Sequence, residues 1–181
     1  ERIQRLSQHV VEVEQALLPH AGILFERPVP ARPVERGQHA RIVAVNPNAS
    51  ELCYERRWPP ERFAACIDRL LADGRTVCLV GDRNEYDYVQ AIATTVPAPR
   101  ERLFNLAGAF DFGEFLAFLQ SCDALLTNDT GIMNFAFSLR VKTLSLWGPV
   151  LPVQYQIFSG RNRHIHKHVY CSPCVHNIDV P

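Results

Sequence analysis

The chain lacks several features that would assign it to particular classes of protein. Its apolar runs all fall well short of the roughly 18 residues of a transmembrane helix, so we expect none. The 19 basic and 19 acidic side chains leave no net charge, which argues against a nucleic-acid partner, because such binding needs a basic excess. The first residues also lack the basic-then-apolar order of a signal peptide. These absences favour a globular protein that binds no nucleic acid.

Three nucleotide-related signatures are missing as well. No GxGxxG follows the first expected strand, so we expect no dinucleotide cofactor. No GxxxxGK[ST] occurs, which excludes a P-loop enzyme, and a Tyr-x-x-x-Lys motif of the epimerase kind is absent too. The sequence therefore points away from redox chemistry and from P-loop nucleotide hydrolysis.

Six cysteines are present, and their contexts differ. Cys66, Cys78 and Cys122 lie in apolar segments, so we expect buried reduced thiols there, whereas Cys53 lies in a polar loop. Cys171 and Cys174 form a CxxC pair, for which a disulfide, two thiols and half of a zinc site are all open. Histidines that could complete a zinc site are His164, His166, His168 and His176, of which the first three alternate and would share one face of a strand.

Strand and helix patterns alternate along most of the chain. Strands of a few residues followed by helices of about a dozen predict right-handed crossovers and an α/β fold with a doubly wound parallel sheet. The expected strands cover 42–45, 76–80, 104–106, 124–127 and 141–147, and the expected helices cover 58–74, 84–95, a segment from 112 onward, and 131 to about 140.

The first forty residues differ from the rest of the chain. Residues 1–18 have an apolar stripe at helical spacing, and residues 25–38 are rich in proline and charge, as linkers are. We therefore expect a helix and an inter-domain linker over 1–39 and one folded domain over 40–181. Because the chain begins with Glu1 and ends abruptly, we also expect it to be a piece of a longer protein.

The most informative stretch runs from Asp123 to Leu139. An apolar strand pattern stops at a Thr-Asn-Asp-Thr-Gly turn, and a helical pattern then begins. The first N–H groups of a helix are unpaired and sit at its positive end, so this turn is suited to phosphate, with Thr130 and Gly131 beside it. A carboxylate repels phosphate, so Asp129 is better interpreted as a helix N-cap or as the partner of a cation or sugar hydroxyl. A capped turn that binds no ligand is the alternative.

Four loops should meet at one edge of the sheet, because a doubly wound sheet binds ligands at the carboxyl ends of its strands. They cover 46–57, 81–85, 127–131 and 148–153. Together they suit an anionic ligand that carries a polar ring. They contain the cations Arg56, Arg57 and Arg83, the acids Asp82, Glu85 and Asp129, and the hydroxyls Ser50, Thr127 and Thr130.

The motifs NPNAS, RRWP, LVGDRNE, NLAG, NDTGIMNFA and LWGP occur in this order. In order and spacing the chain resembles the heptosyltransferase-like glycosyltransferases of family nine, which include ADP-heptose:lipopolysaccharide heptosyltransferases. The resemblance implies the C-terminal, Rossmann-like half of a GT-B fold, which binds the nucleotide sugar. The acceptor site and catalytic base would lie in a missing N-terminal domain. It also implies a bacterial protein of the cytoplasm, either there alone or peripheral at the inner membrane.

The resemblance also implies roles for single residues. Arg56 resembles the basic residue that neutralises the donor phosphates, and an arginine can do so with two parallel hydrogen bonds. Asp129, Thr130 and Gly131 resemble the D-[ST]-G that holds the donor phosphates and sugar. No metal or other cofactor is needed for these roles.

Further positions follow from the same resemblance. Asn48 and Ser50 would contact the donor from the first loop, and Glu85 would meet the ribose. Met133 would line the base or sugar pocket, with a place in the core as the alternative. Trp58 is interpreted as a packing residue.

One position departs from the family pattern, in which a histidine stands three residues after the motif's glycine. Here the residue is Asn134, which can donate a hydrogen bond but cannot carry a proton back and forth. The expected ligands are a nucleotide sugar such as ADP-heptose and a glycan or lipopolysaccharide acceptor, and the chain alone should bind the donor without turnover. A binding module that has lost transfer activity and an unrelated α/β enzyme remain the alternatives.

Overall fold

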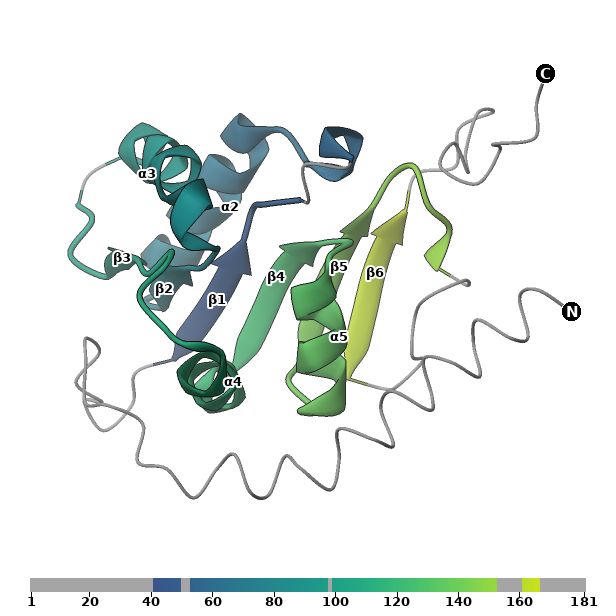
Figure 1. The fold of residues 1–181 in the computed structure, drawn as a ribbon. Helices are drawn as coiled ribbons and strands as arrows, with labels where there is room; N and C mark the ends of the chain where they lie inside the picture. Colours follow the sequence, from purple (N-terminus) through teal and green to yellow (C-terminus); the bar gives the residue numbers. More distant parts are fainter. Residues whose placement is uncertain (1–40, 50–52, 98, 153–160, 167–181) are drawn as a thin grey trace, which may run out of the picture.

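The computed structural model of the chain describes residues 41–49, 53–97, 99–152 and 161–166. The helix expected over 1–18, the linker over 25–38, Ser50 and the Cys171–Cys174 pair lie outside these residues. Six strands form one parallel sheet in the order β3-β2-β1-β4-β5-β6 (Figure 1). The expected doubly wound α/β sheet is therefore confirmed.

The strands follow the apolar runs of the sequence closely. Each of the five expected strands is present with its ends shifted by at most two residues, and a sixth strand, β6, was not predicted. The strands are β1 (Ile42–Asn46), β2 (Thr76–Leu79), β3 (Leu103–Asn105), β4 (Ala124–Asn128), β5 (Thr143–Trp147) and β6 (Asn162–His166).

The helices cover both faces of the sheet around β1. They are η1 (Tyr54–Arg56), α2 (Pro60–Ala72), η2 (Arg83–Glu85), α3 (Tyr86–Thr95), α4 (Phe112–Ser121) and α5 (Gly131–Ser138). Val43 and Val45 belong to the core on the α2 and α3 side, whereas Ile42 and Ala44 belong to the core on the α4 and α5 side. Successive strand residues point to opposite faces, which explains why β1 is apolar at four consecutive positions.

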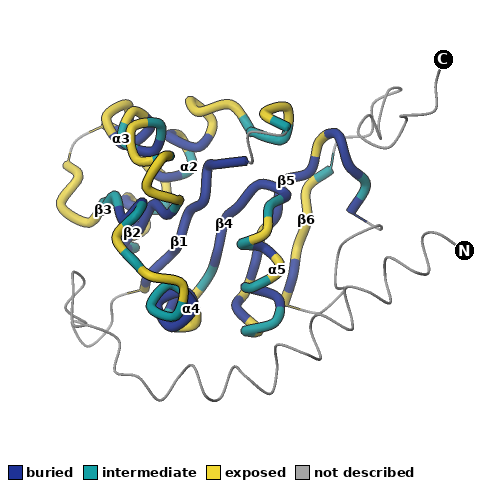
Figure 2. The backbone as a smooth tube through the Cα atoms, in the orientation of Figure 1, coloured by how far each residue is buried: buried dark blue, intermediate teal, exposed yellow. Residues whose placement is uncertain are grey.

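The sheet is less covered at its β6 edge. Figure 2 shows β1 and β4 buried along nearly all of their length, whereas most of β6 is exposed. Leu144 of β5 and Ile165 of β6 are 37% and 56% exposed. In the part of the chain that the structure describes, no helix is long and apolar enough to cross a membrane.

Two helices end in the same backbone geometry with different residues. After α2, Gly74 has a φ of 78°, its N–H donates to Leu71, and the next N–H donates to Leu70. After α5, Arg140 has a φ of 57° and repeats this pattern of hydrogen bonds to the last turn. Glycine adopts this left-handed conformation without steric cost, but a residue with a Cβ does not. Arg140 therefore holds a strained position at the amino end of β5.

We expect Arg140→Gly to raise the free energy of unfolding by about 1 kcal/mol, because removing the Cβ relieves the left-handed strain. Urea denaturation followed by circular dichroism measures the change. The matched control is Gly74→Ala, which introduces the same strain after α2 and should cost about 1 kcal/mol. A loss of stability in Arg140→Gly would mean that the arginine side chain stabilises the turn by more than its backbone costs.

Candidate functional site

The strand order changes direction between β1 and β4. From β1 the chain moves outward to β2 and β3, then returns to the other side of β1 to form β4, β5 and β6. The loops that follow β1 and β4 therefore diverge at their carboxyl ends, and such a point is where doubly wound sheets bind ligands. The candidate site lies at this edge.

Three polar side chains join β1 to the turn after β4. Asn46 Nδ2 donates to Thr127 Oγ1 at 3.1 Å and to Thr130 Oγ1 at 3.0 Å, and the two threonine hydroxyls are 3.2 Å apart. Asn46 and Thr127 are buried. The Thr130 hydroxyl is thus held by Asn46 and Thr127 of the sheet, so the turn before α5 has a fixed position.

Asn128 binds two segments to the end of β4. Its Nδ2 donates to the carbonyls of Pro47 at 2.9 Å and Asn48 at 3.0 Å, and its Oδ1 accepts from the Trp58 N–H at 3.1 Å. The residue has no exposed surface. Because buried amides need such partners, this side chain fixes the position of the first loop, and of the segment that leads into α2, relative to the sheet.

Asn48 lies under the loop after β2. Its Nδ2 donates to Asn46 Oδ1 and to the Val80 carbonyl, both at 3.0 Å, and the residue is 2% exposed. A Cβ at Gly81 would overlap this amide, so β2 needs glycine at its carboxyl end. The Asn48 amide nitrogen is therefore bound within the protein, and the expected contact between Asn48 and the donor stays a prediction.

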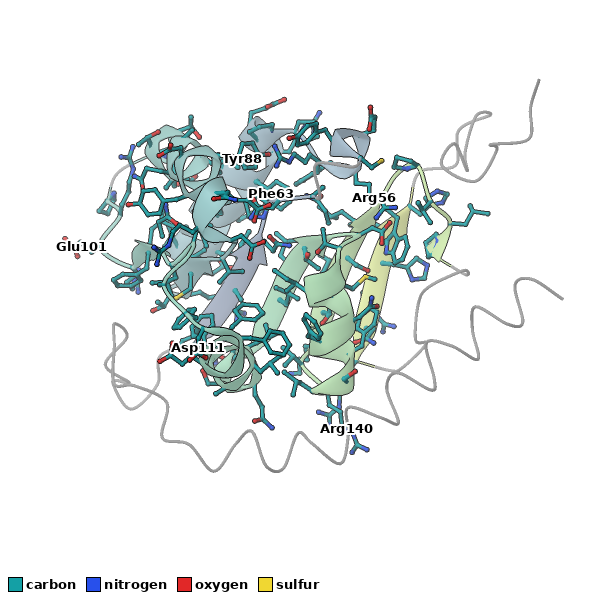
Figure 3. The ribbon with its side chains drawn as sticks, in the orientation of Figure 1. Arg56, Phe63, Tyr88, Glu101, Asp111 and Arg140 are labelled. Atoms are coloured by element: carbon teal, nitrogen blue, oxygen red, sulfur yellow. The ribbon has the colours of Figure 1, made fainter. Side chains whose placement is uncertain are left out.

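Arg56 and Asp129 meet at the rim of the edge. Arg56 Nε lies 3.8 Å from Asp129 Oδ2, with 27% of the arginine side chain and 9% of the aspartate side chain exposed. Figure 3 shows Arg56 above the carboxyl ends of β4 and β5, far from Arg140 at the opposite end of the sheet. Asp129 was interpreted either as the N-cap of the helix or as the partner of a cation or sugar hydroxyl. The structure shows it as the partner of a cation, Arg56, and the N-cap of α5 is Thr130.

The amino-terminal half of α5 has two exposed residues, Gly131 and Asn134. A Cβ built on Gly131 meets no atom within 4 Å, so the space above it is open. Asn134 is exposed one turn later, and residues three apart lie on the same side of a helix. Met133 points the other way and is 1% exposed in a cluster with Phe137, Trp147 and Val150. The core alternative for Met133 is the one that the structure shows.

Glu85 acts locally as a cap in this structure. Its Oε2 accepts from the Asp82 N–H at 2.8 Å, and the two residues form a reciprocal capping box at η2. This bond holds the carboxylate beside Gly81, at the carboxyl end of β2. The predicted contact between Glu85 and a ribose stays untested.

An aromatic pocket next to this edge was not predicted from the sequence. It has a volume of about 220 Å³ and lies between the ends of β2 and β3, the start of α4 and the first turn of α5. Phe112 is 55% exposed, and its ring packs edge-on against Phe135 at a centroid distance of 5.2 Å. The spacing of three phenylalanines in AFDFGEF could have indicated it. The lining residues are Val80, Gly81, Asp82, Leu106, Phe110, Asp111, Phe112, Phe115, Ile132 and Phe135.

Of the cysteines within the described residues, Cys66, Cys78 and Cys122 belong to the apolar clusters, whereas Cys53 directly precedes η1 and its carbonyl accepts from the Arg56 N–H. Cys78 and Cys122 are buried as expected, whereas Cys66 is partly exposed. Burial raises the pKa of the Cys78 thiol to about 12, so it stays protonated at neutral pH. Among residues 41–49, 53–97, 99–152 and 161–166, no three His, Cys, Asp or Glu side chains are grouped to hold a metal ion.

The strand order and the polar edge define a Rossmann-like α/β domain with its site at the switch point of the sheet. The sequence matches the family described as "Glycosyltransferase family 9 (heptosyltransferase)" over residues 2–180. The chain therefore belongs to glycosyltransferase family 9, as its motifs suggested.

Relatives and solved structures agree with this assignment. Lipooligosaccharide heptosyltransferase 2 of Haemophilus influenzae is 31% identical over 98 residues, which cover 54% of this chain and 28% of that protein. Lipopolysaccharide heptosyltransferase 2 of Escherichia coli is 28% identical over 98 residues, 54% of this chain and 28% of that protein. The structure of E. coli ADP-heptose lps heptosyltransferase II superposes with a TM-score of 0.66 at 25% identity, covering 71% of this chain and 39% of that one.

A further solved structure, E. coli heptosyltransferase WaaC with ADP, has a TM-score of 0.62 at 15% identity and covers 70% of this chain and 38% of that one. At that identity it shows a shared fold. The chain spans less than a third of the length of the two curated relatives named above.

We expect Asn128→Asp to lower the free energy of unfolding by about 3 kcal/mol at pH 7, because a carboxylate would face two carbonyl oxygens without a donor. The introduced carboxyl should have a raised pKa in the folded state, so stability lost at pH 7 should partly return as the pH falls below that pKa. Urea denaturation at pH 5 and pH 7 measures both effects. The matched control is Asn105→Asp, at a partly exposed amide, where the loss should be smaller.

Proposed function

We propose that this chain is the donor-binding domain of a glycosyltransferase. The enzyme would move a heptose-like sugar from a nucleotide diphosphate sugar to a lipopolysaccharide or another cell-surface glycan. The observation that carries the proposal is the position of Arg56 and Asp129 beside the open first turn of α5, at the switch point of the sheet. Family membership and the named heptosyltransferase relatives support it.

The donor diphosphate would lie over Gly131. The N–H groups of the first turn of α5 point to this edge, and the positive end of the helix dipole favours an anion there. No Cβ fills the space above Gly131, so phosphate oxygens can approach the backbone closely. Arg56 would meet them from the rim, with Asp129 orienting its guanidinium.

The base of the nucleotide would enter the aromatic pocket. Ile132 lines this pocket and directly follows Gly131, so a ligand on the first turn of α5 continues into it. Phe112 and Phe135 provide ring faces and edges on which a base can pack. Asp82 and Asp111, also in the lining, can accept hydrogen bonds from ribose hydroxyls or an exocyclic amine.

Transfer would proceed by departure of the diphosphate from a sugar with oxocarbenium character. Negative charge grows on the leaving oxygen, and fixed donors aimed at that charge lower the barrier. Arg56 and the N–H groups of α5 would supply these donors, so no metal or other cofactor is required. The base that deprotonates the acceptor hydroxyl would come from an N-terminal domain, and residues 1–181 alone would bind the donor without transfer. The proposal places the enzyme in the cytoplasm, peripheral at the inner membrane where a lipid-linked acceptor is reached.

Asn134 supports a second candidate, a nucleotide-sugar binding module without transfer activity. Its side chain is exposed on the same side of α5 as Gly131, where the family pattern has a histidine. Asparagine cannot exchange a proton at neutral pH, so a step that needs a charged side chain there would be lost. Both candidates share donor binding and differ in turnover by the complete protein.

Titration of the 181-residue chain with ADP, GDP and UDP tests the donor site. We expect binding by calorimetry that is unchanged by EDTA, with NMR shifts concentrated at Asp129–Gly131 and around the aromatic pocket.

Gly131→Ala should leave the urea midpoint unchanged or higher, since its Cβ meets open space, yet weaken nucleotide binding at least about tenfold by filling the phosphate position. No shift at the first turn of α5 with any of the three nucleotides would remove the proposal.

Arg56→Ala tests the charge at the rim. We expect ADP binding to weaken by about 1.5–3 kcal/mol, the range for hydrogen bonds to charged groups, while adenosine binding hardly changes. The salt dependence of ADP binding should also fall, because one cation no longer faces the phosphates. The matched control is Arg62→Ala, which removes an exposed arginine from the first turn of α2. Equal losses for ADP and adenosine would assign Arg56 to loop structure.

A further inference from the structure

Arg57, the residue after Arg56, is held between two aromatic rings. Its guanidinium carbon lies 4.6 Å from the ring centroid of Tyr54 and 4.2 Å from that of Tyr88, both within cation–π range. One guanidinium nitrogen also donates to the Ala49 carbonyl at 3.3 Å. Tyr54 belongs to η1 and Tyr88 to α3, so Arg57 ties the loop before α2 to a neighbouring helix and to the first loop.

These contacts make Arg57 differ from Arg56. Arg56 reaches the rim and Asp129, whereas the Arg57 guanidinium lies over two rings of the protein itself. The Arg57 guanidinium is therefore held by contacts within the protein, although the residue is only partly buried.

The backbone links the two arginines rigidly. The Arg57 N–H donates to the Tyr54 carbonyl at 2.8 Å, the Arg56 N–H donates to the Cys53 carbonyl at 3.3 Å, and the Trp58 N–H is bound by Asn128. The loop is thus fixed on one side by Asn128 and on the other by the ring of Tyr88. We propose that Arg57 is a positioning residue, which binds no ligand and holds Arg56 toward Asp129 and the donor phosphates through its contact with Tyr88.

The ring of Tyr88, and not its hydroxyl, should provide this support. The hydroxyl is buried with no hydrogen-bond partner among the described residues. Burial raises the pKa of this phenol, and Arg57 opposes the shift, so Tyr88 stays neutral at working pH and offers its π face. Tyr88→Phe should therefore preserve the support, and Tyr88→Leu should remove it.

A double-mutant cycle measures the coupling, and this part of the inference rests on the proposed binding of a nucleoside diphosphate. Arg57→Ala and Tyr88→Leu should each weaken ADP binding about tenfold, whereas Tyr88→Phe should stay within about twofold. In the Arg56→Ala background, neither change should cost more than about twofold, because the residue being positioned is gone. The slope of ADP affinity against salt should fall in Arg56→Ala and remain in Arg57→Ala.

Hydrogen exchange of the ligand-free chain separates the two proposals. The amides of Arg56 and Arg57 should exchange at least about tenfold faster in Arg57→Ala and Tyr88→Leu, with no comparable change in Tyr88→Phe or in the core strands. If the wild-type chain binds no nucleotide, the donor-binding proposal fails, and exchange at these amides still decides whether Arg57 and Tyr88 hold the loop.

Two results would overturn the inference. Equal losses of ADP affinity in both backgrounds, with a reduced salt slope in Arg57→Ala, would show that Arg57 contacts phosphate directly. Unchanged exchange at Arg56 and Arg57 in Tyr88→Leu would show that the ring does not hold the loop. Should Arg57→Ala fail to fold, Arg57→Lys replaces it in the cycle, since a lysine keeps the charge but loses the planar group that lies between the rings.

Discussion

Buried asparagine amides, above all that of Asn128, hold the carboxyl edge of this domain together. The two donors of Asn128 satisfy carbonyls of the loop after β1, and its acceptor satisfies the N–H of Trp58. A carboxylate has no donor to give, and an aliphatic side chain would leave three backbone groups without a partner in a buried place. The position of Arg56 and the first turn of α5 relative to the sheet therefore depends on this residue and on its neighbour in the network, Asn46.

The elements that the sequence predicted are those that bury apolar faces. β1, β2 and β4 are recognisable because parallel strands covered on both sides are apolar at successive positions, and the helices between them carry stripes at helical spacing. β6 was missed because it is an edge strand with the sequence Asn-Arg-His-Ile-His, in which three central residues are exposed. A pattern based on burial cannot detect a strand that is barely buried.

The site was predicted in outline, and its limits have physical causes. Arg56, Asp129 and Gly131 lie together because the carboxyl ends of β1 and β4 meet, which topology alone implies. Met133 could not be assigned, because one residue along a helix turns a side chain by about 100°, enough to move it from the ligand side to the core. The structural role of Asn128 was hidden for another reason, since an asparagine at a strand end also fits a solvent-exposed turn.

The aromatic pocket adjoins the polar edge at Val80 and Gly81, but its lining contains none of the three asparagines that hold the edge. The edge depends on Asn46, Asn48 and Asn128, whereas four of the ten residues that line the pocket, Phe112, Phe115, Ile132 and Phe135, come from α4 and α5. Phe112 is exposed, and no fold-determining hydrogen bond of the edge involves it. Under the proposed function, substitutions at the start of α4 would therefore change the shape offered to a base while the backbone around Gly131 stays the same. Under the same proposal, these residues give an engineer a small set of positions at which to select for a different nucleotide without rebuilding the domain.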